Sequence, residues 1–173
     1  DETANVLTKE GFLRTGDLGV LDHAGRLRIT GRMKELFKTS KGQYVAPALI
    51  ENRLMANVDV EHVCVVGMGF AQPLALVTLS AQARSMMSLN PPVQCAAFLA
   101  FLETVNEELS RHEQLSHLVL LQDNWSVDNS MLTPTLKIKR HVIEDHYKEK
   151  IPIWAKERLP IVMASASPTG RGP

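Results

Sequence analysis

Two short, strongly apolar segments, Val60–Gly67 and Leu74–Leu79, constrain the fold of this chain more than any other feature of its sequence. Apolar segments of this length, bounded by turn-forming residues, predict strands that are largely buried. Leu118–Leu121 is a third segment of the same kind. We therefore expect these three strands to form the central sheet of one domain.

The longest helix is expected between Val93 and Leu109, after Pro91-Pro92. Its apolar residues recur at helical spacing, which predicts one buried face lying on the sheet: Phe98, Phe101, Leu102, Val105 and Leu109. Helices and strands mix along the chain without a regular strand–helix–strand alternation. The predicted fold class is therefore α+β, a small central β-sheet flanked by helices.

Shorter elements are expected on either side of this core. A β-hairpin is predicted from Phe12 to Thr30, with its turn at Asp22–Gly25, and a second strand pair flanks the loop Lys38–Gly42. Pro47 is a suitable first residue for a helix. Further helices are predicted before Tyr147 and, around Trp154, between Pro152 and Pro160.

Composition narrows the range of functions. The net charge is zero at pH 7, which argues against a broad electrostatic surface for nucleic acid. Cys64 and Cys95 lie beside apolar residues, and no Cys and His spacing typical of a metal site occurs. We therefore expect two buried thiols in a reducing, cytoplasmic compartment. Charges interrupt the apolar stretches well before the ~20 residues that a membrane span needs.

Three segments concentrate polar residues beside turns. In the first, Arg14–Asp17, the carboxylate of Asp17 could accept two hydrogen bonds from the vicinal hydroxyls of a ribose, although an ordinary turn Asp gives the same pattern. In the second, Gly31–Gln43, several cations and a glycine loop could hold a phosphate or form a solvated linker. In the third, Thr133–Arg140, three cations precede a helix. The helix dipole disfavours cations there, so a functional role is as well supported by this pattern as a basic helix start.

The order of these segments resembles the adenylate-forming superfamily, which includes acyl-CoA synthetases, luciferases and peptide-synthetase adenylation domains. The resemblance is unbroken over GFLRTGDLGVLDHAGRLRITGRMKELFKTSKGQYVAPALIE and extends from about Gly11 to Tyr147. KTSKGQYVAPALIE and LTPTLKIKR are most similar to the long-chain fatty acyl-CoA synthetases. Two positions depart from the pattern. Lys41 precedes Gly42 where the family often has lysine after a glycine pair, and Leu136 precedes Lys137 where the wider superfamily usually has glycine.

The resemblance implies a role for each of five residues. Asp17 would bind the ribose of the nucleotide and Arg32 would contact the nucleotide itself. Lys34 would be the hinge about which the domain rotates. Gly42 would face the pantetheine channel of CoA, and Lys137 would be the catalytic lysine. The resemblance implies no metal ligand among these residues.

The resemblance also implies a reaction and a domain plan. The chain would be the C-terminal fragment of an ATP-dependent acyl-CoA synthetase that uses a fatty acid, ATP, Mg²⁺ and CoA. Residues 1–33 would be the last hairpin of a large domain plus the hinge, 34–163 the small lid domain, and 164–173 a disordered tail. The opening at Asp1 is typical of the interior of a longer protein.

The main partner of such a fragment would be its own large domain, without which it should be inactive. The full-length enzyme could associate peripherally with a membrane. Two alternatives remain open. The acceptor could be the phosphopantetheine of a carrier protein, as in acyl-AMP ligases, or the chain could be a non-catalytic interaction module that retains the lid fold.

Overall fold

The computed structural model describes residues 6–164, and its body is built on a four-stranded mixed sheet with the strand order β5-β6-β7-β8. Strand β5 pairs antiparallel with β6, whereas β6, β7 and β8 run parallel to one another. The strand bounds are β5 (Val60–Val66), β6 (Leu74–Leu79), β7 (Leu118–Leu121) and β8 (Ile161–Ala164). The three predicted strands are thus confirmed, and β8 adds a fourth.

Three helices cover one face of this sheet: α2 (Pro47–Leu54), α3 (Ala81–Leu89) and α4 (Pro91–Glu107). As predicted, the apolar stripe of α4 faces the sheet, with Phe98, Leu102 and Val105 buried. Burial of one such side chain contributes about 1.5–3 kcal/mol. Alternate residues of the strands, such as Val63 and Val65, complete this half of the core.

The opposite face is covered by α5 (Arg140–Tyr147), α6 (Ile151–Trp154) and the long segment that joins β7 to α5. Tyr147 is fully buried, and its hydroxyl donates a hydrogen bond of 2.8 Å to Oδ2 of Asp123. Trp125 is also buried, and its Nε1–H donates to the Tyr147 hydroxyl at 3.4 Å. These contacts hold the β7–α5 segment against the sheet.

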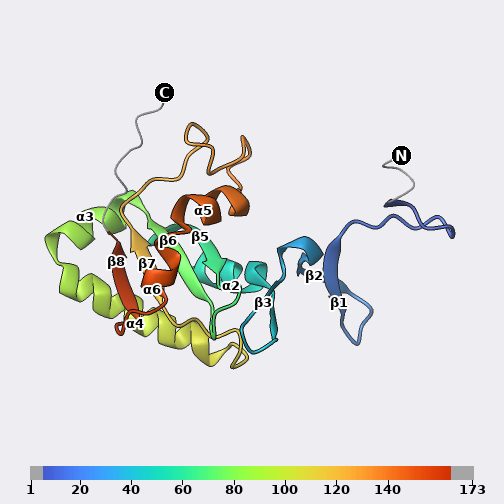
Figure 1. Cartoon of the computed structure of the whole chain (residues 1–173), viewed down its shortest axis with the longest axis horizontal. Helices are drawn as coiled ribbons and strands as arrows, with labels where there is room; N and C mark the ends of the chain where they lie inside the picture. Colours follow the sequence, from blue (N-terminus) through green and yellow to red (C-terminus); the bar gives the residue numbers. More distant parts are fainter. Residues whose placement is uncertain (1–5, 165–173) are drawn as a thin grey trace.

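The N-terminal hairpin, β1 (Asp17–Leu21) and β2 (Leu27–Arg32), projects away from this body (Figure 1). It leads through a single 3₁₀ turn, η1 (Met33–Glu35), into a second hairpin, β3 (Phe37–Lys38) and β4 (Tyr44–Val45). Both predicted hairpins are present, but the first one spans Asp17–Arg32 rather than the predicted Phe12–Thr30. Apolar side chains of the first hairpin and its approach stay largely exposed: Phe12 72%, Leu13 62%, Leu21 67%, Leu27 64% and Ile29 56%.

Four details differ from the sequence prediction. Helix α3 was not expected, and Ser80 caps it by accepting a hydrogen bond from the backbone N–H of Ala83. Ala164 was assigned to a disordered tail, but it is 5% exposed in β8, while residues 165–173 lie outside the described residues. Cys64 is buried as expected, whereas Cys95 is only half-buried. Strand β8 was missed altogether.

Within residues 6–164, no helix combines the length and the apolar character that crossing a membrane requires.

Candidate functional site

Asp17 and Arg32 lie opposite one another at the open end of the first hairpin. The Arg32 Nε lies 3.2 Å from the Asp17 Oδ1, and the side chains are 68% and 29% exposed. Gly16, with φ of 77°, turns the chain into β1, and its carbonyl accepts a hydrogen bond from the N–H of Met33. The structure therefore brings these two predicted residues together, and one ligand could contact both a carboxylate and a guanidinium there.

Lys34 lies in the centre of η1 and is exposed. The backbone is extended on both sides of this turn, with φ of −117° at Arg32 and −62° at Leu36. A short turn between two extended residues links the first hairpin to β3 along the chain, and the end of β2 also contacts α2. This position is compatible with a hinge, because a few residues at the end of an element can absorb a large rotation.

Gly42 occupies the last position of the tight β3–β4 turn and has φ of 79°. Thr39 closes this turn with its main chain and its side chain. Its carbonyl accepts from the N–H of Gly42 at 3.0 Å, its N–H donates to the Gln43 carbonyl at 2.9 Å, and its Oγ1 accepts from the N–H of Gln43 at 3.2 Å. Glycine suits this left-handed position because it has no Cβ.

A polar hollow of about 630 Å³ opens beside the Gly42 turn. It is lined by Lys41, Gln43, Ala71, Gln72, Arg111, His112 and Gln114, a set without a carboxylate. Within the part of the chain that the structure describes, Lys41 and Arg111 make no ion pair. Two uncompensated cations beside one hollow favour an anionic ligand. No sequence pattern pointed to Arg111, because only the fold brings it close to Lys41.

Lys137 lies at the end of a second tight turn, between β7 and α5. Thr133 closes it: its carbonyl accepts from the N–H of Leu136 at 2.8 Å, its N–H donates to the Lys137 carbonyl at 2.8 Å, and its Oγ1 accepts from the N–H of Lys137 at 3.1 Å. Leu136 has φ of 59°, in the left-handed region. The Lys137 side chain is exposed and has no ion-pair partner among residues 6–164.

Arg140, the third cation of this segment, has a different environment. Its side chain is only 14% exposed, and Nη2 donates to Oε1 and Oε2 of Glu51 at 2.8 and 2.9 Å. Nη1 donates to the Val65 carbonyl at 2.8 Å and to Sγ of Cys64 at 3.4 Å. Burial raises the pKa of the Glu51 carboxyl, while the Arg140 guanidinium and the Val65 N–H oppose that rise. The sequence pattern singled out the cation but did not reveal this pairing.

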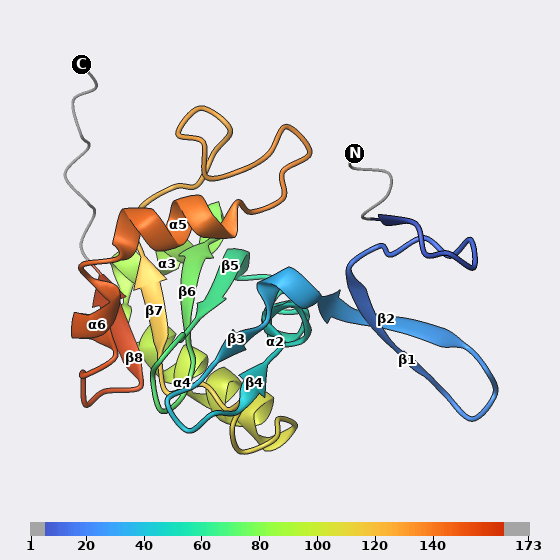
Figure 2. The ribbon, with the colours of Figure 1, turned by 45° about the vertical axis from the view of Figure 1, so that its right-hand side comes forward.

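The Gly42 and Lys137 turns lie at opposite ends of the sheet (Figure 2). The Gly42 turn lies where β6 and β7 begin, because its neighbour Phe70 and the residues of the polar hollow precede these strands. The Lys137 turn lies beyond the end of β7, in the segment that leads to α5. A single compact ligand site outside this domain therefore cannot contact both turns in one orientation.

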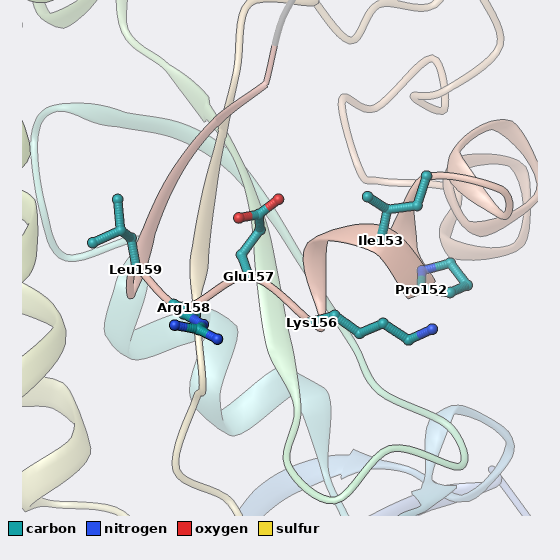
Figure 3. Close-up of a pocket in the computed structure, with 6 residues that line it drawn as sticks. All are labelled: Pro152, Ile153, Lys156, Glu157, Arg158 and Leu159. Atoms are coloured by element: carbon teal, nitrogen blue, oxygen red, sulfur yellow. The ribbon is translucent and has the colours of Figure 1, made fainter.

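A second hollow, of about 520 Å³, lies at the turn between α6 and β8 (Figure 3). It is lined by Pro152, Ile153, Lys156, Glu157, Arg158 and Leu159. The side chains of Lys156 and Glu157 point in different directions there. None of the five predicted site residues lines this hollow, so it is separate from the candidate site.

No group of three or more His, Cys, Asp or Glu side chains within residues 6–164 is arranged to hold a metal ion. The residues described here therefore do not fit a Mg²⁺ site of their own.

The fold and these two exposed turns define a small α+β domain with two separate candidate binding surfaces. A family model described as the AMP-binding enzyme C-terminal domain matches residues 35–156, and the chain belongs to this family.

Curated relatives agree with this assignment. The chain is 32% identical over 173 residues to the peroxisomal long chain acyl-CoA synthetase 6 of Arabidopsis thaliana, covering 90% of this chain and 24% of that protein. It is 34% identical over 167 residues to the human long-chain-fatty-acid–CoA ligase 6, covering 87% of this chain and 24% of that protein. The chain thus spans about a quarter of the length of these relatives.

Solved structures confirm the fold. The adenylation domain of a carboxylate reductase from Mycobacterium chelonae superimposes with a TM-score of 0.78 at 23% identity, over 90% of this chain and 25% of that one. A two-domain fragment of the carboxylic acid reductase of Segniliparus rugosus, in complex with AMP, gives a TM-score of 0.77 at 22% identity, over 90% of this chain and 22% of that one.

Proposed function

We propose that this chain is the C-terminal lid of an ATP-dependent long-chain acyl-CoA synthetase. The domain plan of the proposal assigns residues 1–33 to the end of a large domain and the hinge, and residues 34–163 to the lid. The two curated relatives named above are a long-chain acyl-CoA synthetase and a long-chain fatty acid–CoA ligase, which supports this substrate class.

In the first half-reaction, a fatty acid carboxylate attacks the α-phosphorus of ATP. An acyl–phosphate bond forms, the bond to the β-phosphate oxygen breaks, and pyrophosphate leaves. Lys137 lies between the carboxylate and the phosphate and offsets the repulsion between the two anions. Its ammonium group is exposed and has no ion-pair partner among residues 6–164, which suits this role. Asp17 holds the ribose hydroxyls, and Arg32 contacts the nucleotide beside it.

In the second half-reaction, the CoA thiol attacks the acyl carbon of the acyl-adenylate. A thioester bond forms, the bond to the phosphate oxygen breaks, AMP leaves, and the thiol proton passes to solvent or to a base. The lid rotates about Lys34 before this step, which withdraws Lys137 and brings the Gly42 turn to the active site. The Gly42 backbone then lies against the pantetheine arm, and Lys41 and Arg111 face the phosphates of CoA.

One observation carries this proposal: the two predicted ligand-facing turns lie at opposite ends of one small sheet. A fixed domain could present only one of them to a shared active site. Rotation of the lid lets one pocket serve two transition states in turn, and the position of η1 between extended residues suits the rotation.

The test is to replace Lys137 by Ala in the full-length protein and to run the two half-reactions separately. Loss of one preorganised charge should lower the adenylation rate roughly 10²–10³-fold. The thioester step, started from supplied acyl-adenylate, should stay nearly normal because the lysine has by then moved away. Equal damage to both half-reactions would show that the lid does not alternate. A carrier protein that replaces CoA as the better acceptor would favour the acyl-AMP ligase alternative.

Replacement of Lys34 by Pro should give the opposite pattern. Proline fixes φ near −65° and would restrict rotation at the hinge. The thioester step should then lose more activity than adenylation. The control is Lys34→Ala, which removes the same side chain but leaves the backbone free to rotate. If Lys34→Ala and Lys34→Pro behave alike, the hinge lies elsewhere.

Two finer features stay predictions. Mg²⁺ would offset the charge of the triphosphate, with ligands from ATP and from residues outside this chain. A cytoplasmic location is proposed from the reduced cysteines, although one relative is a peroxisomal protein.

A further inference from the structure

Arg140 is the first residue of α5, and only Ile138 and Lys139 separate it from Lys137. That segment is held at two points before the helix begins. Leu132 and Ile138 form an isolated bridge, and the N–H of Lys139 donates to the Met131 carbonyl at 2.8 Å. Arg140 supplies the next anchor along the chain, so its position limits where the Lys137 turn can lie.

The Arg140 side chain makes its hydrogen bonds with residues of other elements. It reaches Glu51 on α2 and the Val65 carbonyl on β5. The Glu51 Oε1 also accepts a hydrogen bond of 2.8 Å from the N–H of Val65. Arg140, Glu51 and Val65 therefore form a closed set of hydrogen bonds that joins the start of α5 to α2 and to the sheet.

This pair is a poor way to gain stability alone. A cation at a helix N-terminus opposes the helix dipole. Two buried charges must also lose their hydration, so that an apolar pair of similar volume often stabilises a fold equally well. The Arg140 Nε is buried without a hydrogen-bond partner in the described part of the chain, which adds to the cost. The geometry, however, is directional, because a planar guanidinium fixes orientation better than an ammonium group does.

The same set of contacts extends toward the proposed hinge. Helix α2 follows β4 directly, so Glu51 belongs to the unit that carries the Gly42 turn. The Oε2 of Glu35, the last residue of η1, lies 4.0 Å from the Arg140 Nη2. Arg140 thus connects three parts of the domain that the proposed lid motion must move together: the end of the hinge, the Gly42 hairpin unit and the Lys137 turn.

We propose that Arg140, held by Glu51, is a positioning residue that fixes the Lys137 turn for the adenylation step. This inference rests on the adenylation role proposed above for Lys137. Arg140 touches no substrate in this proposal. It transmits the orientation of α2 and η1 to Lys137, so that the ammonium group reaches the correct place when the lid is in its adenylation state.

The test is a double-mutant cycle in the full-length protein, with Arg140→Lys, Lys137→Ala and the double variant. Lysine keeps the charge but cannot make the same set of directed hydrogen bonds. A displacement of Lys137 by about 1 Å should lower the adenylation rate about 10- to 100-fold. The KM for ATP and the thioester step from supplied acyl-adenylate should change by no more than about twofold.

The cycle separates a positioning role from a structural one, because positioning acts only through Lys137. Arg140→Lys should therefore have almost no effect on adenylation when Lys137 is already Ala. If Arg140→Lys lowers adenylation by the same factor in both backgrounds, or has no effect in either, the positioning role is refuted. If Lys137→Ala alone leaves adenylation unchanged, the proposed function fails first, and the two failures are distinguishable.

Arg53 provides a matched control. It lies on the same helix as Glu51 and forms an ion pair with Glu108, far along the chain from the Lys137 turn. Arg53→Lys should leave both half-reactions unchanged. Should Arg140→Lys fail to fold, Glu51→Gln carries the same cycle, since it keeps an acceptor for Val65 but removes the charge that holds Arg140. Glu51→Gln should lower the adenylation rate when Lys137 is present and have almost no effect on it when Lys137 is Ala. Equal effects of Glu51→Gln in both backgrounds would overturn the proposal.

Discussion

The turns around Gly42 and Lys137 share one backbone design at opposite ends of the domain. In each, a Thr closes the turn with three hydrogen bonds of the same type: two through its main chain and one through its hydroxyl. In each, the fourth residue has a left-handed backbone, with φ of 79° at Gly42 and 59° at Leu136. The turns differ in which residue occupies that position.

The difference matches what each turn is proposed to present. A glycine leaves the backbone bare, so that a ligand can approach the Gly42 turn closely. The Lys137 turn acts through a side chain at the next position, and a Cβ on Leu136 does not block it. Leu136 is 65% exposed, so its conformational cost of about 1–2 kcal/mol is not offset by deep burial. The wider superfamily usually has glycine at this position, which avoids the backbone strain that Leu136 retains in this chain.

Apart from the variants of Lys137 and Arg140 described above, the largest effect that distinguishes the two turns is expected at the Gly42 end. Lys41→Gln combined with Arg111→Gln should raise the KM for CoA about tenfold in the full-length protein, equivalent to about 1.4 kcal/mol of binding free energy. The KM for ATP should not change, because these cations are proposed to meet only CoA. Higher salt should weaken CoA binding by the unmodified protein more than by the variant.

A matched control exists at the α6–β8 hollow. Lys156→Gln combined with Arg158→Gln removes two exposed cations from a different surface of the same domain. This control should leave the KM for CoA unchanged. Equal increases for both double variants would mean that net charge, rather than the hollow beside Gly42, governs CoA affinity.

A smaller effect is expected when the residues at the left-handed positions are exchanged. Gly42→Leu should lower the free energy of unfolding by about 1–2 kcal/mol, since a Cβ is unfavourable at this φ. A Cβ there would meet only the Lys38 side chain, at 3.7 Å, so the loss reflects conformation rather than a clash. Leu136→Gly should raise the free energy of unfolding by about 0.5–1 kcal/mol, because part of the relief is lost to the flexibility of glycine in the unfolded chain. Urea unfolding of both variants measures the difference, and changes of the same sign would refute the shared design.

Most of the central fold could be predicted from sequence because its strands and its longest helix are strongly apolar or clearly periodic. Val63 to Val66 and the stripe of α4 are buried as the pattern predicted. Strand β8 was missed for a physical reason. It lies at the sheet edge, only partly buried, and it is recognisable only by its pairing with β7. The small residues that follow Ala164 also favoured an unstructured end.

The candidate site was predictable only where its residues are close in sequence. Asp17 and Arg32 belong to one hairpin and are therefore close, although their direct pairing depends on a register shift between Leu18 and Gly19 that the sequence did not reveal. Arg111 beside Lys41, and Glu51 beside Arg140, are brought together by the fold across long separations. The likeness of the two turns was also hidden, because it lies in backbone angles and in the bonds of a Thr rather than in a shared motif.

The smallest effect is expected from pH at the Lys137 end. Burial lowers the pKa of His62 below its ordinary value of about 6.5, and Glu61 partly opposes this shift. The unfolded chain therefore binds more protons at this residue just below pH 6.5, so that its contribution to stability is present above that pH and is lost as the pH falls. The His62 ring lies 6.3 Å from that of Trp125, which anchors the segment carrying the Lys137 turn.

Acidification from pH 7.5 to 5.5 should thus lower the hydrogen-exchange protection of residues 132–139 by a small factor, and that of residues 39–43 by less. Glu144 on α5 has a pKa raised by burial, which opposes the trend because its protonation favours the folded state. The control is therefore His62→Gln, which removes the titration of residue 62 and leaves that of Glu144. The variant should lose the preferential acid sensitivity of residues 132–139. If it keeps that sensitivity, the protonation of His62 does not govern the stability of the Lys137 end.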